Sequence, residues 1–276
     1  MPELPEVETV ARQLEPEIEG RRIESLRRRG KYLLMDLEGG VTLVMHLRMT
    51  GNLLLVDEGD LVAAVDESAF ERGERYLRAR FSLDEGRELW FSDARRFGEA
   101  FVLATDRIEE RFAGRVGIEP FSPEFTPEAL GAMAAGRTAP LKSFLLDQAG
   151  IAGVGNIYAD EALWRAELHP LSPAGSMRHE HAEALREGVI EALQVGLEEG
   201  GASIDDYLDS RGERGSAQDE FIVHGREGET CPRCGDTIRR VVVSGRSTYF
   251  SPGCQVRLRR RPRRRRSRAA AQGARR

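Results

Sequence analysis

The chain has 276 residues, 40% of them hydrophobic, so it can bury a substantial core and we expect two domains. No apolar run approaches the roughly 18 residues that cross a bilayer, and no apolar signal-peptide stretch opens the chain, so a membrane-spanning or secreted protein is not expected. The net charge of −5 hides an asymmetry, because residues 1–254 contain 30 basic and 46 acidic residues whereas residues 255–276 contain eleven arginines and no acid. An acidic body with a basic, disordered tail weakly favours a nucleic-acid partner.

The chain opens with MPELPEVETV, which has two readings. In the first, Pro2, Glu3 and Glu6 are helix-start residues, because proline fits a first helical turn and acidic side chains there suit the helix dipole. In the second, removal of Met1 leaves Pro2 as a free secondary amine, which is a nucleophile flanked by two carboxylates. The opening segment alone does not decide between them.

Periodicity divides the remainder into a β half and a helical half. Apolar residues recur at helical spacing up to Ile18, and this predicts an opening helix that ends near Gly20. From Lys31 onward the pattern predicts strands in hairpins, at KYLLMDL (31–37), VTLVMHL (41–47), GNLLLVD (51–57), YLRARFSL (76–83), RELWFSD (87–93) and EAFVL (99–103). Beyond Pro123 it predicts four helices, at TPEALGAMAAG (126–136), APLKSFLLDQ (139–148), NIYADEALWRAEL (156–168) and residues 177–199.

A hairpin-like module near the end carries a partial metal motif. Zinc ribbons use two C-x2-C pairs, because each tight turn presents two thiolates to a tetrahedral ion. Cys231, Cys234 and Cys254 stand in this register, but Ser251 occupies the fourth position. Either His224 or a water completes a zinc site, or the hairpin folds without metal. Three cysteines, an odd number, fit a reducing cytoplasm better than a disulfide framework.

The segment GVGNIYA (153–159) lies between two predicted helices. Its glycines allow the backbone to approach a partner closely, and Asn156 opens a helix whose N–H groups can receive a phosphate. A tight turn with Asn156 as helix cap explains the same residues.

Taken together, these motifs resemble bacterial formamidopyrimidine-DNA glycosylases of the formamidopyrimidine-DNA glycosylase and endonuclease VIII family. The matching blocks follow one order: MPELPEVET, RRGKYLL (28–34), HLRMTG (46–51), DARRFG (93–98), LKSFLLDQ (141–148), GVGNIYADEALW (153–164) and the cysteine hairpin. Leu4 resembles the purine-lesion branch, since the endonuclease VIII branch usually has glycine there.

The resemblance implies an α+β multidomain fold: an N-terminal β-sandwich with an opening helix, a helix-two-turn-helix domain and a zinc-finger-like hairpin. We expect a catalytic domain at 1–120, a DNA-binding helical domain with a lesion-capping loop at 121–220, the hairpin at 221–255 and a basic disordered tail at 256–276. It also implies a monomeric cytoplasmic, nucleoid-associated enzyme of base-excision repair that binds damaged double-stranded DNA and one zinc ion. Its activity would be that of a bifunctional glycosylase for oxidised purines and an AP lyase.

Site residues transfer from the resemblance one by one. Pro2 would attack C1′ of the damaged nucleotide and form an imine, Glu3 would move protons at the sugar, and Glu6 would help to position the opening helix. Lys31, one of two lysines in the chain, would bind phosphate at the lesion. His46, Asn156 and Arg246 would be further phosphate ligands, and Met49, Arg95 and Phe97 would fill the gap left by an everted base.

The chain departs from the family pattern at several positions. Only residues 21–30 separate Gly20 from Lys31, where the family has a longer stretch with a strand, so the sandwich is expected to lack a strand pair. Arg48 replaces a glycine, Ala94 a proline, His224 a tyrosine and Ser251 a cysteine. Two alternatives to a glycosylase for oxidised purines therefore stay open. One is a protein that binds damaged DNA with little or no turnover, and the other is an endonuclease VIII-like glycosylase for oxidised pyrimidines.

Overall fold

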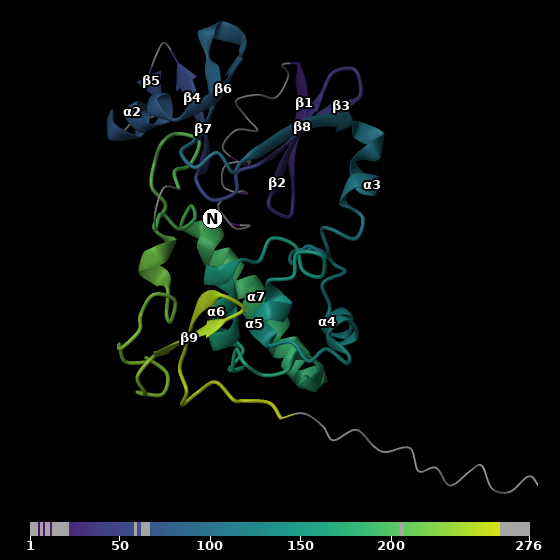
Figure 1. Ribbon diagram of the computed structural model, residues 1–276, viewed down its shortest axis with the longest axis vertical. Helices are drawn as coiled ribbons and strands as arrows, with labels where there is room; N and C mark the ends of the chain where they lie inside the picture. The colour runs from purple at the N-terminus through teal and green to yellow at the C-terminus, as the bar shows by residue number, and fades with distance from the viewer. Residues whose placement is uncertain are drawn as a thin grey trace, which may run out of the picture.

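The computed structural model describes Pro5, Glu8, Arg12 and residues 22–57, 60–61, 67–204 and 207–259. A β lobe and a helical lobe lie one above the other in Figure 1, and a β-hairpin accompanies the helical lobe. The α+β architecture expected from the sequence is confirmed. The β lobe comprises β1 (Ile23–Arg29), β2 (Tyr32–Leu37), β3 (Val41–His46), β4 (Gly51–Asp57), β5 (Asp60–Leu61), α2 (Glu67–Arg75), β6 (Leu77–Ser82), β7 (Glu88–Asp93), β8 (Glu99–Ala104) and α3 (Ile108–Phe112).

Two antiparallel sheets form the β lobe, with strand orders β1-β2-β3-β8 and β5-β4-β7-β6. Side chains alternate between the two faces of β2, because successive residues of a strand point to opposite sides. Leu33 and Met35 pack into the core between the sheets, whereas Leu34 packs on the outer face against Ile108 and Phe112 of α3. Both faces of β2 are therefore covered, which explains its continuous apolar sequence.

The short segment before Lys31 is itself a strand, so the prediction that strands begin at Lys31 is wrong. β1 pairs with β2 along its length, and Gly30 (φ +58°) and Lys31 make the tight turn between them. The sequence hid β1 because ion pairs replace apolar alternation along it. Arg27, for example, donates to Asp36 of β2 at 2.7 and 3.1 Å. Helix α2 was also missed, because most of its residues are charged and only Ala69 and Phe70 are apolar.

A cavity of about 360 Å³ opens beside β1, between the two sheets. Its walls are mainly apolar and include Ile23, Met35, Leu43, Phe81 and Leu83. These residues lie at the edge of the main sandwich core, with which all five also pack. The sandwich is thus incompletely filled at this edge.

The helical lobe contains α4 (Pro127–Ala134), α5 (Leu141–Leu145), α6 (Asn156–Arg165) and α7 (His179–Glu198), close to the predicted ranges. Helix α4 starts as proline and capping rules predict, with Thr126 Oγ1 accepting from Ala129 N. Helices α6 and α7 approach closely because glycines face α6: a Cβ on Gly188 would lie 2.6 Å from Ala162 O. No described helix is long and apolar enough to cross a membrane.

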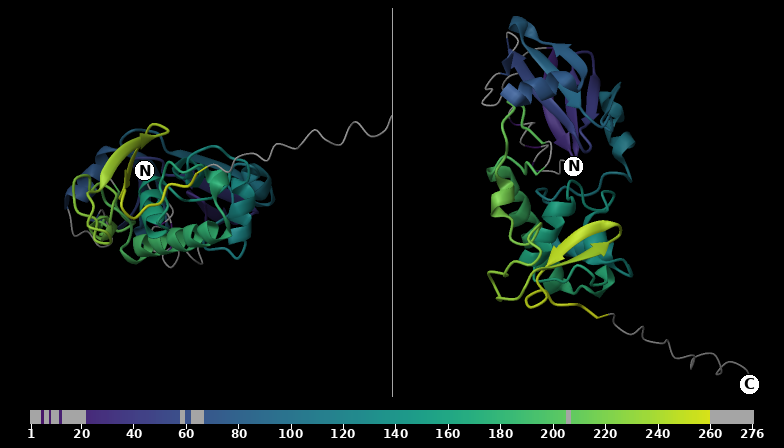
Figure 2. Two further views of the ribbon diagram at one scale, coloured as in Figure 1. Left: turned by 90° about the horizontal axis from the view of Figure 1, so that it is seen from below. Right: turned by 60° about the vertical axis from the view of Figure 1, so that its left-hand side comes forward.

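Two connections attach other parts of the chain to this frame. Strands β9 (Arg239–Val243) and β10 (Arg246–Phe250) form the hairpin, which lies beside α6 in both Figure 1 and the right view of Figure 2. The segment 207–210 reaches the β lobe, where Leu208 N donates to Asn52 Oδ1 at 2.9 Å and Leu55 N donates to Ser210 O at 2.8 Å. The long polar stretch after α7 therefore connects the two lobes.

Candidate functional site

The three residues of the proposed catalytic N-terminus, Pro2, Glu3 and Glu6, lie outside the described residues. Three neighbours in the opening segment, Pro5, Glu8 and Arg12, are helical. Glu8 and Arg12 form an ion pair at helical i,i+4 spacing, with 3.1 Å between Oε1 and Nε. The helix predicted for this segment is thus present at each described position.

Lys31 lies in the β1–β2 turn and is almost fully buried. His46 ends β3, and its register partner Tyr32 directly follows Lys31 and stacks edge-on against the imidazole at 4.6 Å. Burial lowers the pKa of His46 to about 3, helped by the charges of Arg48 and Lys31. The neutral imidazole accepts from Arg48 N through Nδ1 at 2.9 Å. The structure therefore brings Lys31 and His46 to one end of the same sheet.

Met49, Arg95 and Phe97 meet on two adjacent loops, and all three are exposed. Arg95 Nη1 lies 3.6 Å from Met49 Sδ, and the Arg95 guanidinium lies 4.9 Å from the centre of the Phe97 ring. Asp93 shapes the second loop, because its carboxylate accepts from Thr50 Oγ1, Arg95 N and Gly98 N. The exposed side chains of Met49 and Phe97 are therefore available to a partner rather than to the core.

Arg48, where the family pattern has glycine, adopts φ +57°. This left-handed conformation is strained for a residue with a side chain, which explains why glycine suits the position. The Arg48 guanidinium instead forms an ion pair with Glu99 of β8, with 2.6 Å between Nη2 and Oε1. Where the family has a flexible glycine directly before Met49, this chain has an arginine that is held by its ion pair with Glu99.

Asn156 begins α6 and contacts the hairpin that carries Arg246. Its Nδ2 donates to Ser247 O at 3.1 Å, and its Oδ1 is buried without a hydrogen-bond partner among the described residues. Gly153 (φ +81°) makes the turn before the helix, where Gln148 accepts from Gly153 N at 3.0 Å and donates to Val154 O at 2.7 Å. The two predicted phosphate ligands therefore lie on neighbouring, hydrogen-bonded elements.

A buried polar cluster next to Asn156 was not predicted from the sequence. Lys142 Nζ donates to Asn156 O at 2.8 Å and to Asp160 at 2.5 Å, and both charged side chains are fully buried. The other Asp160 oxygen lies 2.9 Å from His224 Nδ1. The only signal in the sequence was a lysine and an aspartate in otherwise apolar helical patterns. His224 faces Asp160 and does not join the cysteines, so its proposed role as metal ligand is wrong.

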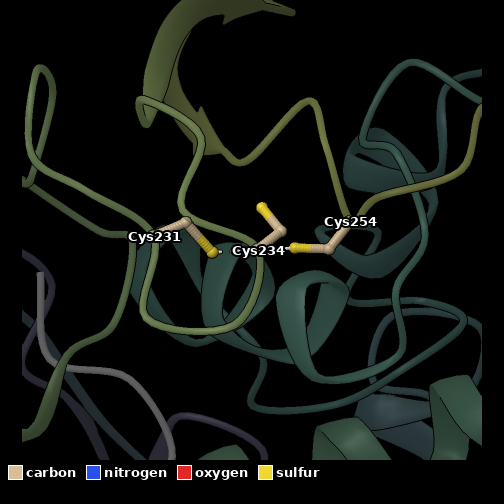
Figure 3. Close-up of side chains that lie close together, drawn as sticks. All are labelled: Cys231, Cys234 and Cys254. Atoms are coloured by element: carbon tan, nitrogen blue, oxygen red, sulfur yellow. Dashed lines mark hydrogen bonds between the residues drawn. The ribbon is translucent and has the colours of Figure 1, made fainter.

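Cys231, Cys234 and Cys254 come together, with all three sulfur atoms within 4.8 Å of one another (Figure 3). Cys231 and Cys254 have 3.7 Å between their sulfur atoms, and the Ser251 hydroxyl lies 3.1 Å from Cys234 Sγ. Ser251 is fully buried, so the fourth position of the motif lies inside the module rather than in solvent.

The cluster also rests on α6. Burial raises the pKa of Cys231, but hydrogen bonds from Ser251, Trp164 and the backbone of Cys234 and Arg233 together outweigh burial and lower it to about 6. Trp164 Nε1 lies 3.4 Å from the Cys231 sulfur. For Cys254, burial, assisted by its hydrogen bonds with Cys231 and Cys234, raises the pKa to about 11. The pKa of the Cys231 thiol therefore lies below that of the Cys254 thiol.

The donor set fits a zinc ion. Tetrahedral ligands about 2.3 Å from zinc place neighbouring sulfur atoms roughly 3.8 Å apart, close to the Cys231–Cys254 separation of 3.7 Å. Ser251 Oγ lies 3.1 Å from Cys234 Sγ, which is a hydrogen-bond distance and is shorter than the distance between two ligand atoms of one zinc ion. The geometry therefore favours three thiolate ligands, with Ser251 as a hydrogen-bond partner.

The matching family models follow the order of these structural parts. The formamidopyrimidine-DNA glycosylase N-terminal domain matches residues 1–27 and 15–100, the H2TH domain of the same family matches 116–207, and a zinc finger found in FPG and IleRS matches 228–256. A β-sandwich, a helix-two-turn-helix domain and a zinc finger in this order define a class of DNA glycosylase of base-excision repair.

Curated relatives and solved structures are similar over most of the chain. Formamidopyrimidine-DNA glycosylase of Chloroflexus aurantiacus is 40% identical over 284 positions, covering 93% of this chain and 98% of the relative, and that of a Roseiflexus species is 43% identical, covering 86% and 82%. The MutM (FPG) structure from Thermus thermophilus has a TM-score of 0.79 at 41% identity, covering 92% and 98%. Lactococcus lactis Fpg bound to DNA with an abasic site has a TM-score of 0.80 at 32% identity, covering 92% and 99%. The chain belongs to the formamidopyrimidine-DNA glycosylase family, whose members are glycosylases and AP lyases.

The family match also locates the missing segment. Two parts of the N-terminal family model both match residues 15–27, so the chain has one segment where the model has two. The alignment with the Chloroflexus relative spans 284 positions, whereas 93% of the 276 residues of this chain is only about 257 residues. About 27 positions of the alignment are therefore gaps in this chain. Arg22 and Ile23, at the described end of this segment, line the cavity between the sheets.

Proposed function

We propose that this enzyme excises oxidised purines, 8-oxoguanine and formamidopyrimidines, from double-stranded DNA and then cleaves the strand as an AP lyase. The observation that carries the proposal is the exposed group of Met49, Arg95 and Phe97 on the same lobe as Lys31. An everted base leaves a gap in the stack, and apolar wedges partly offset the few kcal/mol that unstacking costs. Structures of Lactococcus lactis FPG with Fapy-dG DNA and with abasic DNA support this substrate class.

The chemistry assigned to Pro2 follows from its amine. An α-amine titrates near ~8 and a lysine near ~10.4, so far more of the α-amine is unprotonated at neutral pH. Its nitrogen forms a bond to C1′ while the glycosidic bond breaks and the base leaves with a proton. The sugar ring opens and leaves the proline nitrogen bound to C1′ as an iminium. The iminium permits β-elimination of the 3′ phosphate and then δ-elimination of the 5′ phosphate, and Glu3 moves the protons. Glu6 helps to hold the opening helix.

The remaining site residues bind and orient DNA under this proposal. Lys31, His46, Asn156 and Arg246 contact phosphates around the lesion. Cys231, Cys234 and Cys254 hold one zinc ion, which keeps the hairpin folded, and a water takes the fourth position. The limits proposed for the functional units are 1–120, 121–220, 221–255 and 256–276. The enzyme acts as a monomer on nucleoid DNA in the bacterial cytoplasm.

Borohydride trapping tests the proposal. Reduction should fix a protein–DNA adduct on duplexes with 8-oxoguanine or an abasic site, and the crosslink should map to the N-terminal peptide. Glu3→Gln should abolish base excision with little loss of affinity, whereas Pro2→Gly, which keeps an amine, should still form some adduct. Retention of lesion DNA without adduct would support the binder without turnover, and preferential excision of oxidised pyrimidines would support the endonuclease VIII-like alternative. An adduct at Lys31 would assign a different nucleophile; Lys142 is excluded from DNA by complete burial beside Asp160.

A further inference from the structure

Two motifs that the proposed roles leave unused meet at the junction between the lobes. Arg28 and Arg29 come from RRGKYLL, and Glu8 comes from the opening helix. Both arginines form ion pairs with Glu119, which lies in the connection between α3 and α4, and Arg28 also pairs with Glu8. The network contains two cations and two carboxylates, so its formal charge is balanced.

Arg28 links the opening helix to the connection. Its Nε donates to Glu8 at 2.6 Å, and its Nη1 donates to Glu119 at 2.7 Å and to Gly30 O at 3.0 Å. The Arg28 side chain is only 11% exposed. Burial raises the pKa of Glu8, but the hydrogen bonds and charges of Arg28 and Arg12 together outweigh burial and lower it. Charge-assisted hydrogen bonds in such a partly dry site are stronger than surface ion pairs.

Glu119 holds the turn that contains Lys31. Its carboxylate accepts from Gly30 N at 2.6 Å and from Arg29 Nη1 at 3.0 Å, in addition to Arg28. Arg29 also donates to Gly117 O at 2.8 Å and to Val116 O at 3.0 Å. The start of the β1–β2 turn, at Arg29 and Gly30, is therefore attached to residues 116–119.

The same connection reaches the loop that precedes Asn156. Gly117 N donates to Gln148 O at 2.8 Å, Ile118 N donates to Gly150 O at 3.0 Å, and Ala152 N donates to Ile118 O at 2.9 Å. The contact is close because Gly117 lacks a side chain: a Cβ there would lie 2.1 Å from Gly150 O. A continuous path of hydrogen bonds thus runs from Glu8 to the start of the GVGN turn.

We propose that Glu119 and Arg28 are positioning residues for the excision reaction. They fix the opening helix, which carries the amine six residues before Glu8, relative to the Lys31 turn and to the N-terminus of α6. The inference rests on the proposed function of Pro2 and Lys31. Neither Glu119 nor Arg28 touches the reacting atoms; each acts through the groups that it holds. Small displacements matter here, because a shift of about 1 Å at a reacting group can slow a reaction on the order of a hundredfold.

The test compares Glu119→Gln, Arg28→Gln and Glu8→Gln with Arg27→Gln as matched control. Arg27 is the neighbour of Arg28 on β1 and forms its ion pair with Asp36, away from the junction. Each variant is assayed for the rate of borohydride-trapped adduct on abasic duplex, for Kd with a non-cleavable tetrahydrofuran duplex, for the pH–rate profile and for Tm. The Glu8 variant keeps the test decisive if the Glu119 variant does not fold.

Glu119→Gln and Arg28→Gln should slow adduct formation by about tenfold or more, with Kd changed less than about threefold. Glu8→Gln should slow it less, and the double variant Glu8→Gln/Glu119→Gln should be no slower than Glu119→Gln, because both act through Arg28. Arg27→Gln should lower Tm but keep the wild-type rate. Wild-type rates in the junction variants, or equal losses in Arg27→Gln, would overturn the inference. Absence of adduct from the unaltered protein would instead refute the proposed function.

Discussion

Asn156 Nδ2 donates to Ser247 O at 3.1 Å and so connects the first turn of α6 to the strand that begins with Arg246. This bond makes the two proposed phosphate ligands structurally dependent on each other. Replacement of one need not have the same consequences as replacement of the other.

Arg246→Gln should weaken binding to every lesion by a similar factor and reduce the slope of log K against log salt by about one unit, because one phosphate contact is lost. The Arg246 side chain is exposed, so Tm should change little. Titrations at several salt concentrations, with 8-oxoguanine, abasic and undamaged duplexes, provide the measurement. A loss confined to one lesion would show base readout instead.

Asn156→Ala should reduce affinity and also lower Tm, since the hairpin loses its bond to α6. We expect a cost of about 1 kcal/mol in the free energy of unfolding, the usual value for one hydrogen bond. Urea titrations of Asn156→Ala and Arg246→Gln, side by side, separate the two effects. Equal stability of these variants would contradict the structural role of Asn156.

Ser251→Cys should raise zinc affinity, because it supplies the fourth thiolate and so completes the second C-x2-C pair with Cys254. Purified protein should contain close to one zinc ion per chain, and chelation should lower Tm more in the unaltered protein than in the variant. Elemental analysis and thermal melts with and without chelator give the readout. Metal-free protein with unchanged Tm and intact DNA binding would exclude a structural zinc.

Arg48→Gly should leave stability almost unchanged, since release of the strained conformation offsets the lost ion pair with Glu99. Arg48→Ala should be less stable than Arg48→Gly by about 1 kcal/mol, because it loses the pair and keeps φ positive. Glu99→Gln reports on the ion pair alone. If Arg48→Ala proved as stable as Arg48→Gly, the backbone strain would be negligible.

His46 should make stability depend on pH. Its pKa is about 3 in the folded protein and near ~6.5 in an unfolded chain, so the unfolded state binds more protons between these values. Its contribution is therefore complete above pH ~6.5 and is lost as pH falls toward 3, by at most about 1.4 kcal/mol per pH unit. Urea titrations at several pH values in this range give the free energy of unfolding as a function of pH. This free energy should fall more steeply with decreasing pH in the unaltered protein than in His46→Gln. Parallel curves would show that His46 does not titrate in this way.

The amino-acid sequence predicted the elements whose signal is local. Strands such as Val41–His46 and helices such as α7 follow apolar periodicity, and short motifs located the loops of Met49 and Phe97. It could not predict β1, whose arginines pair with Asp36 on another strand and with Glu119, about ninety positions away. The buried Lys142–Asp160 pair was hidden for the same reason. The sequence around a charged residue does not indicate which distant residue will pair with it in the fold.

The support of the hairpin on α6 has a consequence for the order of folding. Glu161 of α6 accepts hydrogen bonds from Ile222 N, Val223 N and His224 N, and the Arg233 guanidinium lies 3.8 Å from the centre of the Trp164 ring. Val223, Cys231 and Ile238 pack with Trp164 in one small core. During synthesis the residues of α6 leave the ribosome before residues 221–259, so they are available when the last part of the chain folds. Expressed as a separate peptide, the hairpin would lack both the α6 acceptor Glu161 and Trp164, which is one of the four buried residues of this core.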